Sequence, residues 1–219
     1  MRQLQKAATI AAFLIFTGML IHNLNALYLE PQTLGFEDPS KDYANMAKIE
    51  NAIWSFSFTS SGTTHIVVGF SLMILGLFMS EFFKRALPIA AKLVFLSAVL
   101  SGLGFLLTGI SDIPGTVYGG ILRELNPDQN TEILLMTTIF RGMVNILAIA
   151  GLGWFAGMIA WCAGKTDTFP KGFRIFGWIN VLPGVISLAS PVFGFVYIQL
   201  LPLWMLWFGL RIRKLELSD

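Results

Sequence analysis

Hydrophobic residues run through this chain in long stretches that short polar segments separate. A helix needs about 20 residues to cross the hydrocarbon core of a bilayer. On this criterion the pattern predicts six membrane-spanning helices, over residues 7–29, 60–82, 87–110, 132–163, 173–188 and 192–210. The last two are separated by a very short turn at Ser190 and Pro191, which predicts a tight helical hairpin. We therefore predict an all-α, polytopic integral membrane protein, with residues 1–219 forming a single transmembrane domain built as a six-helix bundle.

Two longer polar segments, 30–51 and 111–131, are expected on the same side of the membrane. The first is acidic, and its pattern from Lys41 to Phe56 fits a short amphipathic helix lying on the membrane surface. Trp54 and Phe56 would be the apolar anchors of that helix. The second segment is rich in glycine and proline, so turns rather than a folded domain are expected there.

The basic residues predict the orientation. Lysine and arginine are enriched in the cytoplasmic loops of membrane proteins. Only Lys41, Lys48 and Arg123 fall in the two longer loops. The opposite side, which includes the N-terminus, carries ten: Arg2, Lys6, Lys84, Arg85, Lys165, Lys171, Arg174, Arg211, Arg213 and Lys214. Both termini are therefore expected in the cytoplasm, and the chain is expected to be a multi-pass protein of the plasma membrane.

The first apolar stretch is interpreted as a span and not as a cleaved signal peptide. Signal peptides end at a small-residue A-x-A site, and the residues that follow the apolar run from Ala7 to Ile21, namely Asn23 to Ala26, do not form one.

The amino-acid composition further narrows the class of protein. The chain is 55% hydrophobic and 13% charged, whereas soluble domains carry about 25% charged residues. The net charge of +2 is too small to indicate nucleic-acid binding. One cysteine, Cys162, allows neither an intrachain disulfide nor a CxxC or zinc pattern. No metal site is expected, and no Walker, dinucleotide-binding or HExxH motif is present.

Five polar side chains inside the apolar pattern are the candidate site residues. A helix rises 1.5 Å per residue, which places all five in the outer third of the predicted bundle. Buried polar groups in a membrane need partners and commonly face the bundle interior. The sequence therefore predicts an outward-facing polar pocket with these ligand-binding residues: His22, His65, Asp112, Arg141 and Asn145.

The two histidines, the only ones in the chain, leave three interpretations open. They could clamp a haem b between two imidazoles. They could ligate a metal, for which two ligands alone make a poor site. They could also be hydrogen-bonded across a packed helix interface or contact a polar ligand. Arg141 likewise fits an ion pair with Asp112, a side chain that snorkels to the outer surface, or a contact to an anionic group of a ligand.

The leading functional hypothesis is binding of a small ligand, lipid or partner through the outer pocket, as an accessory subunit of a membrane complex or as a homo-oligomer. One alternative is a b-type cytochrome with His22 and His65 as axial ligands. Another is a membrane-embedded enzyme acting on a lipid or quinone-like substrate, with His22, His65 and Asp112 in acid–base roles. A small transporter would need a continuous polar path to the inner side, and Asn180 is the clearest polar group there. The sequence assigns no catalytic residue and no cofactor.

Overall fold

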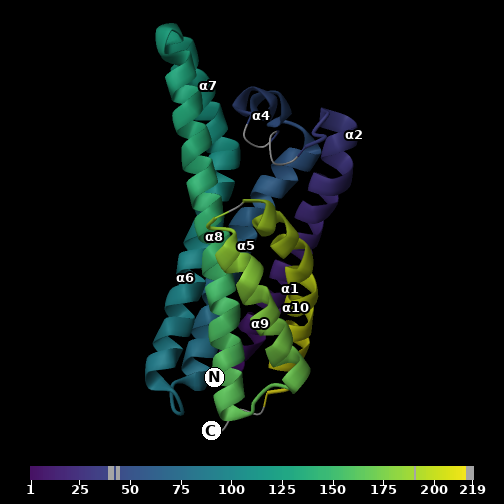
Figure 1. Cartoon of the computed structure of the whole chain (residues 1–219), viewed down its shortest axis with the longest axis vertical. Helices are drawn as coiled ribbons and strands as arrows, with labels where there is room; N and C mark the ends of the chain where they lie inside the picture. The colour runs from purple at the N-terminus through teal and green to yellow at the C-terminus, as the bar shows by residue number, and fades with distance from the viewer. Residues whose placement is uncertain (39–41, 43–44, 190, 216–219) are drawn as a thin grey trace.

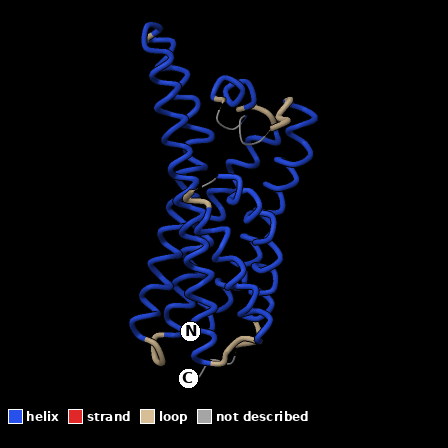
Figure 2. The backbone as a smooth tube through the Cα atoms, in the orientation of Figure 1, coloured by secondary structure: helices blue, strands red, loops and turns tan. Residues whose placement is uncertain are grey.

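The computed structural model describes residues 1–38, 42, 45–189 and 191–215. Every regular element within these ranges is a helix (Figure 2). The six long helices are α1 (Arg2–Leu24), α5 (Phe56–Phe83), α6 (Pro88–Ile110), α8 (Asn130–Thr166), α9 (Lys171–Ile186) and α10 (Pro191–Ile212). This confirms the predicted all-α class.

The six long helices close into a ring. Each packs against the next along the chain, and α10 packs back against α1 (Figure 1). The Nε2 atom of Gln5 donates to the carbonyl oxygens of Ile212 and Leu215, at 2.8 and 2.9 Å. These bonds join the first helix to the last at the end of the bundle where both chain termini lie. We call this end the terminal end and the opposite one the distal end.

Four helical stretches are long and apolar enough to cross a membrane, which supports the membrane-spanning class. They are Arg2–Leu34, Phe56–Phe83, Pro88–Leu125 and Pro127–Thr166. A shorter apolar helix covers Tyr197–Ile212. The helix α9 has 16 residues, fewer than the roughly 20 that a crossing usually requires.

At the distal end the helices continue beyond the expected spans (Figure 1). Helix α1 leads through the π-helical turn η1 (Asn25–Leu29) into α2 (Glu30–Leu34). Helix α6 leads through the π-helical turn η2 (Ser111–Gly115) into α7 (Thr116–Leu125), and the 3-10 turn η3 (Pro127–Gln129) follows. The expectation of turns over 111–131 is therefore corrected, because most of that segment is helical and returns along the start of α8.

The helix α4 (Met46–Ala52) lies over the distal end and forms part of the amphipathic segment expected from Lys41 to Phe56. Lys41 itself lies outside the described residues. Ile49 and Ala52 of α4 are buried in a small apolar cluster with Phe36 and Phe58. Trp54 and Phe56, the expected anchors, are 78% and 83% exposed. The segment therefore covers the bundle on one side and presents aromatic rings on the other.

Small residues allow the closest helix contacts. Gly62, Gly69 and Gly76 recur at intervals of seven along α5 and meet α6. A Cβ atom added at Gly69 would lie 2.7 Å from the carbonyl oxygen of Gly102. A Cβ added at Gly76 would be closer still to the Cβ of Ala98. Side chains larger than glycine would separate these backbones, as at other small-residue interfaces in membranes.

Candidate functional site

Four of the five predicted site residues lie together in the distal part of the ring. His22 comes from α1, His65 from α5, Asp112 from η2 and Arg141 from α8. Nδ1 of His65 is 3.0 Å from Oδ2 of Asp112, and Nε of Arg141 donates to Oδ1 at 2.6 Å. The rings of His22 and His65 are 4.7 Å apart between centroids. We call these four residues the polar cluster.

Asp112 is the centre of the polar cluster. Its side chain is 3% exposed, and each carboxylate oxygen contacts a different helix. An ionised carboxylate only accepts hydrogen bonds, so Nδ1 of His65 donates to it, and in a neutral imidazole the Nε2 atom is then the acceptor. Fixing an imidazole in one tautomer and orientation is the role that carboxylates have beside histidines in acid–base sites.

His22 joins the cluster through a ring contact. Its Nδ1 atom is buried and has no hydrogen-bond partner among the described residues. Its ring lies against that of His65 at a tilt of 47°. One side of His65 is therefore held by a carboxylate, and its face is covered by a second imidazole.

The histidine spacing does not fit a haem held between the two rings. A metal lies about 2 Å from each imidazole nitrogen, which sets the ring centres roughly 6 Å apart. The observed 4.7 Å is shorter, and the rings are tilted. Within the described residues, no three His, Cys, Asp or Glu side chains are arranged to hold a metal ion. The polar cluster therefore supports hydrogen bonding and ion pairing between helices.

The local sequence explains how Asp112 reaches His65. Gly62, one turn from His65 on α5, lets η2 approach so closely that an added Cβ would lie 3.2 Å from that of Asp112. Pro114 lies inside η2. Proline lacks a backbone donor and clashes with the preceding turn, and the wider π-helical turn accommodates it. The hydroxyl of Thr116 donates to the carbonyl oxygen of Asp112 at 3.0 Å.

Asn145, the fifth predicted residue, is not joined to the others. It lies one turn from Arg141 on α8 and is half-buried. In the described part of the chain its side chain makes no hydrogen bond to the polar cluster. Of the predicted ligand-binding set, the structure brings together His22, His65, Asp112 and Arg141.

A buried acid was missed by the sequence interpretation. The polar pattern assigns Glu30 to the outer segment 30–51, but in the structure Glu30 begins α2 and is 0% exposed. The hydroxyl of Ser61 donates to its carboxylate at 3.3 Å. Asn25 donates to Ser60 and Ser61 and to the carbonyl oxygen of Ser57. The serines at the start of α5 therefore bond to η1 and α2, which continue α1 toward the distal end. Asn25, a polar residue in an apolar stretch, was the available signal.

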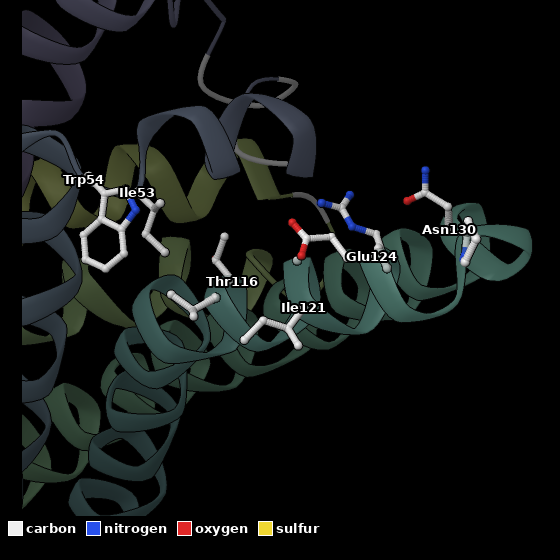
Figure 3. A pocket seen from close by; sticks show the side chains of 10 residues that line it. Ile53, Trp54, Thr116, Ile121, Glu124 and Asn130 are labelled. Atoms are coloured by element: carbon white, nitrogen blue, oxygen red, sulfur yellow. The ribbon is translucent and has the colours of Figure 1, made fainter.

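An open cleft of about 670 Å³ lies farther toward the distal end (Figure 3). We call it the distal cleft. Ile53 and Trp54 form one wall, and residues of α7 form the other (Figure 3). Its lining is Ile53, Trp54, Thr116, Val117, Gly120, Ile121, Arg123, Glu124, Pro127 and Asn130. None of the five predicted site residues lines it. Through Thr116, however, the distal cleft lies one helical turn from Asp112.

Fold and site together define an all-helical protein, of the kind that spans membranes, with a buried His–Asp–Arg cluster beneath an open cleft. No family of known proteins matches this chain, and no curated protein or solved structure is significantly similar to it.

Proposed function

We propose that this chain is a six-span protein of the plasma membrane that binds a small amphiphilic ligand, such as a single-chain lipid, in its distal cleft. Its termini are cytoplasmic and its distal end faces outward. Both termini lie at one end of the closed ring, which requires an even number of crossings. Most of the lysine and arginine residues lie near the terminal end, as the positive-inside rule requires.

The distal cleft is the single observation that supports this ligand class. Its volume of about 670 Å³ falls in the range of small-molecule sites, about 300–1,000 Å³. Trp54, Ile53 and Ile121 supply apolar surface, while Arg123 and Glu124 supply neighbouring charges of opposite sign. An apolar chain with a zwitterionic head matches this lining. The polar cluster beneath holds α5, η2 and α8 in register, and so fixes the floor of the distal cleft.

The test fills the distal cleft with a larger side chain. Ile121→Trp places a bulky ring inside it, and Leu122→Trp is the matched control, because Leu122 is similarly exposed and is not part of the lining. Both variants and the wild type would be titrated with lysophosphatidylethanolamine in nanodiscs and followed by native mass spectrometry. We expect a saturable adduct that Ile121→Trp loses and Leu122→Trp retains. Equal adducts in all three proteins would refute the proposal.

A second candidate function is acid–base catalysis on a lipid or quinone-like substrate. The Asp112–His65 bond at 3.0 Å favours it, because it leaves one imidazole nitrogen as an acceptor. Lipid extracts of cells expressing the wild type or His65→Gln would reveal it through a species that only the wild type produces or consumes. The cytochrome alternative has no comparable support, since the ring spacing does not fit a haem.

We also propose that the chain is an accessory subunit of a membrane complex or forms a homo-oligomer. Exposed apolar side chains along the distal half of α8, among them Met136 and Met143, offer surface for a neighbour or for lipid. A pull-down from native membranes that returned only this chain, as a monomer, would count against partner subunits and a homo-oligomer alike.

A further inference from the structure

Three buried polar side chains inside the ring each have an atom that can form a hydrogen bond but has no partner among the described residues. Asn180 of α9 and Tyr197 and Trp204 of α10 are each 0% exposed. The Oδ1 atom of Asn180, the hydroxyl of Tyr197 and Nε1 of Trp204 have no hydrogen-bond partner among the described residues. Buried polar groups of native proteins are nearly always paired with protein or with ordered water. We call these three residues the α9–α10 polar site.

The three groups lie along one interface. The ring of Trp204 is 3.6 Å from where a Cβ of Gly177 would be, and Asn180 is one turn farther along α9. Tyr197 precedes Trp204 by seven residues on α10, and so lies on the same face of that helix. Helical side chains lean toward the N-terminus of their own helix. Because α9 runs toward the distal end, Asn180 lies one turn from the Trp204 ring on its distal side, and its side chain leans back toward the level of that ring.

Their hydrogen-bonding capacities are complementary. Oδ1 of Asn180 only accepts, the indole N–H of Trp204 only donates, and the hydroxyl of Tyr197 does both. The Nδ2 atom of Asn180 already donates to the carbonyl oxygen of Phe176 at 2.7 Å. A small neutral molecule that both donates and accepts, such as water, satisfies the remaining groups. A charged ligand does not fit, because none of the three side chains carries a charge at neutral pH.

The two ends of the site differ. Toward the distal end, Asn23 of α1 donates to the carbonyl oxygen of Ile198 at 3.1 Å and accepts from Gln199. These bonds place Tyr197 at about the level of His22, whose Nδ1 also lacks a partner among the described residues. Toward the terminal end, Phe173 stacks on Trp204 at 5.2 Å, and Phe208 contacts both rings. Aromatic rings therefore pack against Trp204 on its terminal side.

We propose that water occupies the α9–α10 polar site and connects the polar cluster to Trp204 in the interior of the ring. This water gives the unpartnered atoms the bonds that they lack and brings exchangeable protons into the bundle from its distal side. The inference is independent of any ligand in the distal cleft.

The test measures hydration at one atom. The full-length protein, with ¹⁵N-labelled tryptophan indoles, is transferred into D₂O in nanodiscs, and Trp204→Phe assigns the signal among the six tryptophans. We expect the indole proton of Trp204 to exchange within minutes. We expect Asn180→Leu to slow this exchange roughly tenfold or more, since an apolar side chain removes an acceptor and dries the site.

A matched control separates hydration from general loosening of the bundle. Ser97 is 0% exposed and lies nine residues from the start of α6, as Asn180 lies nine residues from the start of α9. Its hydroxyl bonds within its own helix, to Val94. Ser97→Ala should leave the Trp204 exchange rate unchanged. An indole proton that persists for days in the folded wild type, or equal rates in wild type and Asn180→Leu, would overturn the proposal.

Discussion

The distal third and the terminal half of the bundle are held together differently. In the distal third, buried charged and polar groups join helices, with Asp112 contacting both His65 and Arg141. In the terminal half, aromatic rings and close backbone contacts do so, as where Phe173 stacks on Trp204. Apolar packing tolerates substitution if volume is conserved, whereas a buried ion pair fixes particular atoms against each other. The relative positions of the helices are therefore determined by particular atom pairs in the distal third, which is also the region next to the distal cleft.

Asp112→Ala should produce the largest effect, because it removes the carboxylate that two helices contact. Losing one partner of a buried ion pair typically costs about 3–5 kcal/mol, and chemical unfolding in detergent would measure the loss. Asp128→Ala is the control, since Asp128 is exposed in η3. Replacing the pair together, as Asp112→Leu with Arg141→Met, should recover part of the stability. A loss no larger than that of Asp128→Ala would contradict the central role of Asp112.

Gly153→Ala tests the packing of the other region, where α8 meets α9. A Cβ at Gly153 would lie 2.8 Å from the Cα of Gly184, so the helices must separate. Overpacking of this kind costs about 1–3 kcal/mol. The same change at Gly142 on the same helix meets nothing within 4 Å, and should stabilise the protein by up to about 1 kcal/mol. Thermal unfolding of the two variants should move in opposite directions.

His65→Phe and His22→Phe sharpen the view of the polar cluster. Of the two histidines, His65 is the one that contacts Asp112, so its replacement should cost about 1–3 kcal/mol through the polar partner left behind. His22→Phe keeps a ring against His65 and should change stability by less than about 1 kcal/mol. Equal losses, or a reduced-minus-oxidised absorbance spectrum with haem bands that both variants abolish, would favour a shared ligand between the rings.

The smallest expected effect is a pH dependence in the segment that covers the distal end. The Lys48 side chain donates to Asp42 at 2.5 Å, and this bond lowers the pKa of the Asp42 carboxyl below its usual value. A lowered pKa stabilises the folded state above the unfolded pKa of about 4, and this contribution is lost as the pH falls through the folded pKa. Wild type should therefore lose more stability than Asp42→Asn between pH 6 and pH 3 in thermal unfolding. Parallel curves would show that the bond contributes nothing.

Much of the fold follows from the sequence, and the depth of the site does too. Long apolar stretches mark helices because a lipid environment leaves the backbone few other ways to satisfy its hydrogen bonds. The helical rise then places His22, His65, Asp112 and Arg141 at one level, and the structure brings these four together. The three glycines at seven-residue intervals on α5 would have identified the contact between α5 and α6, since small residues that recur on one face mark close helix pairs.

Other features depend on contacts between distant segments. The π-helical turn at Ser111–Gly115, the burial of Glu30 and the wall that Trp54 forms opposite α7 are not visible in hydropathy. An extra residue in a helical turn changes the direction of every later side chain. Which atom of Asp112 meets His65 therefore depends on how α5, α6 and α8 pack.

By itself, the sequence determined the helical class, the approximate spans and the level at which polar groups gather, because these depend on hydrophobicity and helical rise along one segment. Only the tertiary structure decided that the helices close into a ring, that one carboxylate joins His65 to Arg141, and that Asn145 stands apart. These depend on the rotation of each helix about its axis, which the close contacts between neighbouring helices determine and local periodicity does not.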